Sequence, residues 1–134
     1  MDLDEIDHRI LNELRRDARA SMSAVARVAH ISRASAYARV NKLTEAGVIT
    51  GYSARIDPVR AGYHASAYVA LLIDQQPWQD LRARLIEIPE VEHIALIGGE
   101  FDLMLLIRAR DNADLRRIVL EEVHAIPSVR STRT

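Results

Sequence analysis

The sequence predicts an α+β chain built from two modules, a three-helix N-terminal module and a β-α-β-β-α-β C-terminal module. Apolar residues recur at helical spacing through residues 3–43, whereas β-prone stretches alternate with helical ones from residue 65 onward. Charge divides in the same way, since residues 1–60 hold 10 basic and 8 acidic residues and residues 61–134 hold 8 and 11. The expected divisions are a helical domain, a β-linker and a second domain, at residues 1–50, 51–63 and 64–134.

Composition excludes several classes of protein. With 134 residues, 49% of them apolar, the chain can form a core, which argues against disorder. It has no cysteine, so disulfides, thiolate nucleophiles and cysteine-based zinc sites are excluded. The acidic start, MDLDEIDHRI, is unlike a signal peptide, and no apolar run approaches the roughly 20 residues that span a bilayer. We expect a soluble, cytoplasmic protein with no membrane partner.

Residues 3–16 are expected to form the first helix. Asp4 suits its N-cap, and Arg15 and Arg16 lie at the end where the helix dipole favours cations. The apolar stripe of this helix consists of Leu3, Ile6, Ile10, Leu11 and Leu14.

Residues 21–43 are expected to form two short helices separated by a tight break at residues 30–32. Ser32 is a good N-cap for the second of them. The inward face of this second helix consists of Ala36, Val40 and Leu43, and its other faces carry Arg33, Ser35, Ala38, Asn41 and Lys42. The pattern is that of a helix-turn-helix, whose second helix enters the DNA major groove. An αα-hairpin with a solvated charged face is the alternative.

The segment after the third helix has the alternating, β-prone character of a strand. Gly47 is expected to be the left-handed C-cap of that helix, and Val48 to Ile56 are expected to be extended. Three helices followed by a strand indicate a winged helix-turn-helix domain. Asp57 and Pro58 end the strand.

The C-terminal module is expected to contain four strands and two helices in the split-βαβ, or ferredoxin-like, order. The strands are expected at residues 65–73, 91–97, 101–107 and 129–134, and the helices from Pro77-Trp78 to Pro89 and from Asn112 to His124. Both faces of the first strand are apolar, and helices can cover only one of them. We therefore expect a second subunit's sheet to cover the other face, which makes the chain a dimer at least.

Positive charge is concentrated at the expected helix-turn-helix, although the net charge of the chain is −1. Residues 15–42 contain seven basic residues and one acidic residue. Such a patch supplies the phosphate-neutralising part of DNA affinity, while arginine and asparagine can read base edges. The candidates for contact with double-stranded DNA are Ser21, Ser32, Arg33, Ser35, Arg39, Asn41 and Lys42. Arg39 has an alternative role, bracing the domain through a carboxylate such as Glu13 or Glu45, and Tyr37 is expected to pack rather than face the groove.

Short motifs along nearly the whole chain occur in an order and spacing typical of one protein family. They are Leu3-Asp4-x-x-Asp7-x-x-Ile10-Leu11-x-x-Leu14, Asp17-Ala18-Arg19-Ala20-Ser21, Ser32, Arg39-Val40-x-x-Leu43, Gly47-Val48-Ile49-x-Gly51-Tyr52 and Gly99-Glu100-Phe101-Asp102. The chain thus resembles the Lrp/AsnC family, the "feast/famine" regulators of bacteria and archaea. The resemblance implies a sequence-specific transcription regulator that dimerises, often assembles further into octamers, and binds amino acids or similar ligands through its C-terminal domain.

The sequence departs from the family pattern at three places. His30 holds a turn position that usually carries glycine, and histidine tolerates a positive φ better than most residues. Gly98 stands where a threonine is common, so a ligand contact is missing or passes to backbone amides. The family's last strand normally continues beyond the position of Thr134, so the fourth strand is expected to be short. Either the edge of the sheet is clipped in this protein or the chain is truncated.

The sequence Gly98-Gly99-Glu100-Phe101-Asp102 is the candidate effector loop. Glycine amides can approach a carboxylate closely, unpaired N–H groups favour anions, and Asp102 can pair with an ammonium group. The candidate effector-binding residues are Gly98, Gly99, Glu100 and Asp102. In isolation these five residues favour a mere hairpin turn with Phe101 in the core. The resemblance favours a binding role.

Two other functions compete with DNA-binding regulation. One is a small dimeric enzyme with His93 or Tyr68 as the acid or base, and the other is a ligand-sensing module without DNA binding. The five histidines show no paired metal-ligand spacing, and no nucleophile elbow is present. We therefore predict no catalytic residue, no metal and no cofactor.

Overall fold

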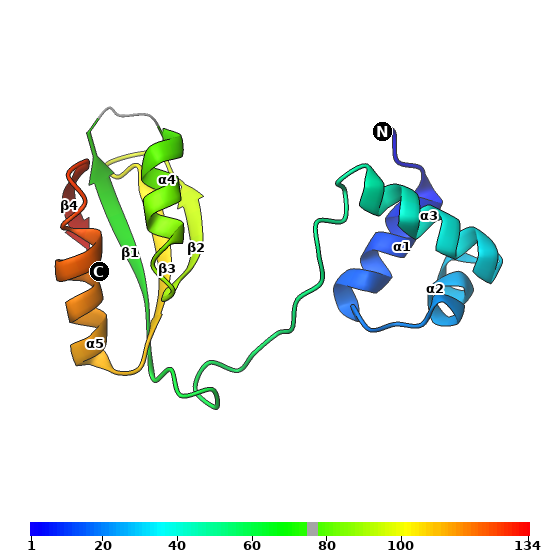
Figure 1. The fold of residues 1–134 in the computed structure, drawn as a ribbon, viewed down its shortest axis with the longest axis horizontal. Coiled ribbons are helices and arrows are strands. Elements are labelled where there is room, and N and C mark those ends of the chain that lie inside the picture. Colours follow the sequence, from blue (N-terminus) through cyan, green and yellow to red (C-terminus); the bar gives the residue numbers. More distant parts are fainter. Residues whose placement is uncertain (75–77) are drawn as a thin grey trace. The chain divides into compact units, whose positions relative to one another are not determined.

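The structure is a computed structural model that describes residues 1–74 and 78–134. The chain divides into two compact units, Met1–Arg55 and Ile56–Thr134, which are described separately (Figure 1). Pro77, at the expected start of a helix, lies outside the described residues. Within the described ranges, no helix is both long enough and apolar enough to cross a membrane.

The first unit consists of three helices around a small apolar core (Figure 1). The helices are α1 (Glu5–Arg16), α2 (Met22–Ala29) and α3 (Arg33–Glu45). The core consists of Ile10, Leu14, Val25, Ala26, Ala29, Ala36, Val40 and Leu43. Three of these residues are alanines on α2 and α3, and such short side chains let two helices approach closely. The expected helices and inward faces are confirmed.

Both ends of α3 are closed by the residues that the sequence indicated. The Ser32 hydroxyl accepts a hydrogen bond from the Ser35 N–H at 3.1 Å. Gly47 has φ of 74° and completes a Schellman motif, because its N–H donates to the Thr44 carbonyl and the Val48 N–H donates to the Leu43 carbonyl. His30, in the turn between α2 and α3, has φ of 57°, which confirms that this turn requires the left-handed region.

The expected strand over residues 48–56 is not formed. The structure assigns no strand to these residues, and only Ile49 packs against the helical core. A β-strand needs a neighbouring strand to receive its backbone hydrogen bonds. No strand of the described chain pairs with this segment, so its β-prone composition alone does not produce one.

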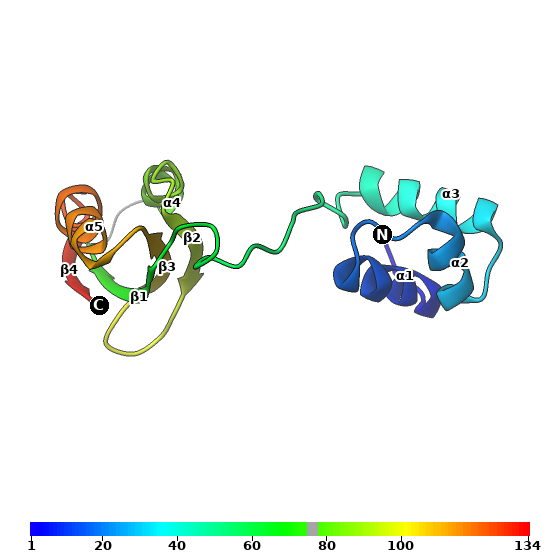
Figure 2. The same ribbon diagram turned by 90° about the horizontal axis from the view of Figure 1, so that it is seen from below.

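The second unit has the expected β-α-β-β-α-β order. It comprises β1 (Ala65–Ile73), α4 (Trp78–Ile86), β2 (Val91–Leu96), β3 (Leu103–Ala109), α5 (Asn112–Arg117) with its continuation η1 (Ile118–Val123), and β4 (Val129–Arg133). The described strands pair antiparallel in the order β2-β3-β1-β4. Figure 2 shows α4 and α5 on the same side of this sheet.

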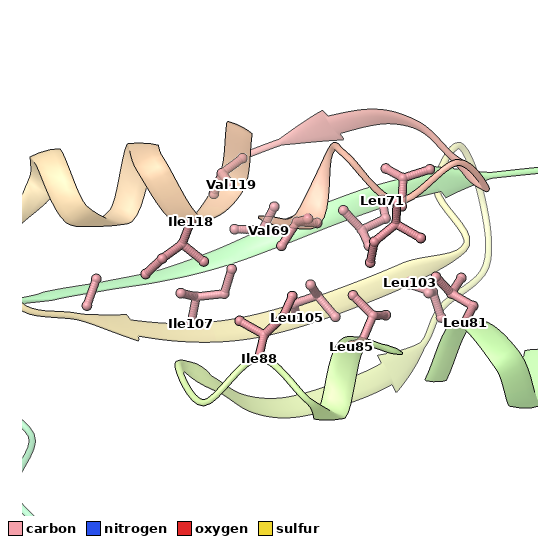
Figure 3. Packing of buried hydrophobic residues seen from close by; sticks show 14 of the residues in the cluster. Val69, Leu71, Leu81, Leu85, Ile88, Leu103, Leu105, Ile107, Ile118 and Val119 are labelled. Carbon is pink, nitrogen blue, oxygen red and sulfur yellow. The ribbon is translucent and has the colours of Figure 1, made fainter. Parts of the chain in front are cut away.

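The pleat of the sheet divides its side chains between two faces. Alternate residues of β3, namely Leu103, Leu105 and Ile107, are fully buried against the helices. Val69 and Leu71 of β1 point into the same core, and Leu81, Leu85 and Ile88 meet them from α4 and the turn after it (Figure 3). The intervening residues face away from the helices.

The last helix differs from its expected form. The stretch from Asn112 to His124 was expected to be one α-helix, but residues 118–123 are π-helical, and the His124 N–H donates to the Val119 carbonyl five residues earlier. Ile118, Val119 and Val123 of this segment are all buried in the core.

One guanidinium joins α3 to the start of α1. Arg39 Nη1 lies 2.8 Å from both carboxylate oxygens of Asp4 and 2.9 Å from Asp7 Oδ1. Asp4 and Asp7 also form a reciprocal capping box at the N-terminus of α1. Asp7 is buried, and the Arg39 side chain is 30% exposed. Arg39 therefore has the bracing role left open by the sequence, through Asp4 and Asp7 rather than Glu13 or Glu45.

We expect Arg39→Ala to lower the melting temperature, because it leaves the buried Asp7 carboxylate without its cation. Asp4→Asn retains a capping oxygen and removes the charge. The hydrogen bond from Arg39 and then the Asp7 N–H hold the pKa of Asp4 below its ordinary value. Such a carboxylate stabilises the fold above its unfolded-state pKa, and that stabilisation is lost as the pH falls through its folded-state pKa.

The difference in melting temperature between the parent and Asp4→Asn should therefore be full at pH 7 and shrink below about pH 4. Thermal unfolding followed by circular dichroism at both pH values tests this. Arg9→Ala is the matched control, because it removes an exposed i,i+4 pair with Glu5. An equal effect of Arg9→Ala and Arg39→Ala would contradict the bracing role.

Candidate nucleic-acid interface and effector loop

The outward face of α3 carries polar side chains that are free to meet a partner. Arg33, Ser35, Asn41 and Lys42 are all exposed. Within residues 1–74 and 78–134, neither Arg33 nor Lys42 forms an ion pair. Glu45, at the C-terminal end, is the only acidic residue of α3. This face therefore presents positive charge and hydrogen-bonding groups to solvent.

The two candidate serines outside this face are helix caps. Ser21 Oγ accepts from the Ala24 N–H at 3.1 Å, and Ser32 caps α3 in the same way. Both side chains are exposed. A capping hydroxyl accepts one hydrogen bond and keeps its own proton for donation. Each serine can therefore cap its helix and donate to a phosphate oxygen.

Two residues of α3, Arg39 and Tyr37, are placed differently from their sequence-based expectations. Arg39 was a DNA candidate, and its guanidinium is engaged by Asp4 and Asp7 instead of lying among the exposed groups. Tyr37 was expected to pack, which is wrong, because the structure leaves it 61% exposed. The core residues that α3 contributes are Ala36, Val40 and Leu43, and Tyr37 is not among the residues packed against them.

The loop between β2 and β3 exposes backbone donors. Gly98, Gly99 and Glu100 are exposed, and Gly99 has φ of 98°. Within the described part of the chain, the N–H groups of residues 98–101 donate to no backbone carbonyl. Phe101 is half-buried and is not part of the described core cluster.

Asp102 fixes this loop to β1. Its N–H donates to the Leu71 carbonyl at 2.9 Å, and its Oδ2 accepts from the Ile73 N–H at 3.0 Å. The Asp102 carbonyl also accepts from the Ile97 N–H at 2.9 Å, which closes the loop. Asp102, the predicted partner of a ligand's ammonium group, therefore also has a structural role. Among the described hydrogen bonds its Oδ1 takes part in none, so one carboxylate oxygen is available to a ligand.

The sheet face opposite the helices, here called the outer face, carries several apolar side chains. Paired residues share a face, and the register places Tyr68 beside Leu106, Leu106 beside His93, and Ala70 beside Met104. Tyr68 is 65% exposed. At one end Arg108 donates to Glu92 Oε2 at 2.6 Å and to Ser66 Oγ at 2.8 Å. The outer face is therefore apolar at its centre and charged at this end.

The enzyme candidates lie on this outer face but not together. His93 on β2 and Tyr68 on β1 are separated by Leu106 of β3. Adjacent strands are about 4.8 Å apart, so residues two strands apart are separated by about 10 Å and do not share a proton. In the described ranges, no group of three or more His, Asp or Glu residues is arranged to hold a metal ion.

Comparison with known proteins matches both units to established families. The family described as winged helix-turn-helix DNA-binding matches residues 3–50, and the Lrp/AsnC ligand binding domain matches residues 66–134. The proline dehydrogenase transcriptional activator of Rhodobacter capsulatus is 37% identical over 133 residues, covering 97% of this chain and 86% of that protein. The regulator LrpA of Mycobacterium tuberculosis is 37% identical over 133 residues, covering 98% and 88%.

Solved structures agree with these matches. The crystal structure of the leucine response regulatory protein LrpA of Mycobacterium tuberculosis has a TM-score of 0.83 at 36% identity, covering 98% of this chain and 89% of that one. A transcriptional regulator of Neisseria meningitidis, solved as its L-Met complex, shows the same fold with a TM-score of 0.87 at 22% identity, covering 98% and 87%. The chain therefore belongs to the Lrp/AsnC family of DNA-binding transcriptional regulators.

Proposed function

We propose that this regulator reads DNA through α3 and responds to an amino acid or a similar small ligand bound at the loop between β2 and β3. The observation that carries the proposal is the exposed face of α3, which bears Arg33 and Lys42 without acidic partners in the described chain. Selection of bound genomic DNA fragments, with and without a pool of amino acids, tests both parts of the proposal. The proposal includes a cytoplasmic location, where the protein would have access to DNA.

The contacts with DNA divide by chemistry. Arg33 is in the first turn of α3, the end of a recognition helix that usually meets base edges, and its guanidinium suits guanine. Asn41 suits adenine, whereas Ser35 and Lys42 suit phosphate oxygens. Ser21 and Ser32 add phosphate contacts from the two helix N-termini, where the dipole also favours an anion.

The loop at residues 98–102 suits the two charged ends of an amino acid. The exposed N–H groups of Gly98 and Gly99 can meet a carboxylate, and the Asp102 carboxylate can meet an ammonium group. Gly98, Gly99 and Glu100 are exposed in a single chain. Because a single chain does not enclose the loop, a second subunit would have to complete the site. The ligand-binding domain that matches residues 66–134 includes this loop, which supports the assignment.

The chain is proposed to act as a homodimer, with octamers as a further possibility for assembly. The outer face exposes Tyr68, which lies beside Leu106, and a second copy of the same sheet could cover it under two-fold symmetry. A two-fold dimer places two copies of α3 on a palindromic or near-palindromic site. We propose no catalytic activity, because the relatives that match nearly the whole chain are transcriptional regulators.

Lys42→Ala and Arg33→Ala should affect DNA binding differently. Lys42→Ala should weaken binding to all sequences and reduce the slope of log K against log salt by about one unit, because one phosphate contact is lost. Arg33→Ala should relax preference at one base position, at a cost of roughly 1–3 kcal/mol there. Titrations at several salt concentrations measure both. Arg82→Ala, which changes an exposed arginine of α4, is the control. If both α3 variants lost DNA affinity equally for all sequences, with unchanged slopes of log K against log salt, the proposed docking of α3 would be wrong.

Tyr68→Glu should convert the dimer to a monomer. A two-fold dimer would bury two unpaired carboxylates, each at a cost of about 3 kcal/mol or more, so the dissociation constant should rise by roughly ten-thousandfold. Sedimentation at low micromolar concentration measures this. Tyr63→Glu is the matched control, because Tyr63 is also exposed but lies before β1. A parent protein that sediments only as a 15.1 kDa species would contradict dimerisation itself.

Asp102→Asn should abolish the ligand response and leave DNA affinity without ligand nearly unchanged. The asparagine keeps an oxygen for the Ile73 N–H but loses the charge for the ammonium group, whereas Asp102→Ala loses both. Fluorescence of Trp78, the only tryptophan, and DNA titrations with amino acids provide the measurements. An unaltered response in Asp102→Asn would place the ligand elsewhere. Loss of folding in both variants would assign Asp102 a structural role alone.

A further inference from the structure

The outward surface of α3 carries an aromatic side chain that the assignments above do not use. Every residue of α3 is described, and Tyr37 is its only exposed large hydrophobic residue. An aromatic side chain that remains 61% exposed contributes little to the core of the unit. It does contribute a large, nearly rigid surface with few rotatable bonds, which loses little entropy on binding. Tyr37 is therefore expected to act by contacting a binding partner.

Helical geometry places Tyr37 on a definite flank of α3. Residues four apart lie on the same side of a helix, so Tyr37 lies between Arg33 and Asn41. At 100° per residue, Ser35 and Lys42 lie on the opposite flank. Arg33 and Asn41, which suit base edges, thus share one flank of α3 with Tyr37. Ser35 and Lys42, which suit phosphates, share the other flank. Tyr37 belongs to the base-reading flank by position.

The neighbours of Tyr37 favour close approach to bases. Ala34 and Ala38, next to it on the outward surface, are exposed and have the smallest side chain apart from glycine. Small residues there allow the α3 backbone to lie deep in the major groove. Successive residues of the Arg33–Tyr37–Asn41 row are about 6 Å apart along the helix axis. Tyr37 would therefore meet a base pair located between those read by its two neighbours.

We propose that Tyr37 is a specificity-determining residue whose ring packs against the 5-methyl group of a thymine in the major groove. This assignment rests on the proposed DNA-binding role of α3. The thymine methyl is the one apolar group that bases present in the major groove, and an exposed ring gains by burying it. An alternative contact, from the tyrosine hydroxyl to a phosphate, would carry no sequence information.

The test uses the full chain and a DNA site selected from a randomised pool by the parent protein. Each thymine of that site is replaced in turn by deoxyuridine, which removes only the methyl group. The parent should lose about fourfold in affinity at one thymine per half-site, the effect of one buried methyl group. Tyr37→Phe should keep this discrimination, because it keeps the ring. Tyr37→Ala should bind thymine and deoxyuridine equally at that position.

Tyr63→Ala is the matched control, because it truncates an exposed tyrosine outside α3 and should leave the thymine discrimination intact. Equal, sequence-independent losses in Tyr37→Phe and Tyr37→Ala would show a phosphate contact through the hydroxyl and overturn the proposal. Thymine discrimination that survives in Tyr37→Ala would overturn it as well, while leaving the DNA-binding role standing. A parent protein that selects no sequence from the pool would overturn both.

Discussion

The position of α3 depends on the ion pairs of Arg39 with Asp4 and Asp7. The inward face of α3 consists of Ala36, Val40 and Leu43, which pack into the core of the first unit. Arg39 adds a polar link from the same helix to the N-terminus of α1, through contacts of 2.8–2.9 Å to two carboxylates. Because Asp7 is buried, loss of the cation would leave an uncompensated charge. Loss of Arg39 would therefore disturb the packing of α3 against α1, and with it the residues that are proposed to contact DNA.

The second unit depends in the same way on the pleat of its sheet. Leu105 and Ile107 of β3 build the core, and the residue between them, Leu106, lies on the outer face. One strand thus supplies both the interior and the surface that is proposed to contact another subunit. A shift of register by one residue would exchange the two sets of side chains. The apolar character of both sets explains why a single chain leaves an apolar face exposed.

The sequence was sufficient to predict features that depend on local patterns and insufficient for those that depend on distant partners. Periodicity placed the helices of the first unit, and capping chemistry placed Asp4 and Ser32. The partner of Arg39 lies more than 30 residues away in sequence, so periodicity could not choose Asp4 over Glu13 or Glu45. Residues 48–56 have strand composition but require a second strand, which composition cannot supply. Tyr37 lies about 100° from Ala36, at the edge of the buried face, where helical periodicity does not decide burial.

The contacts of Asp102 indicate how a ligand at the proposed effector loop would influence assembly. Asp102 bonds to the backbone of Leu71 and Ile73, on either side of Leu72, whose side chain lies on the outer face. A ligand that draws the Asp102 carboxylate away from the Ile73 N–H would shift this end of β1 and thereby the packing surface of Leu72. Packed interfaces change between discrete arrangements rather than deforming gradually, so a small shift can favour one assembly over another. We infer that the ligand would act on DNA binding through the relative affinity of two assembly states, without any contact between the loop and α3.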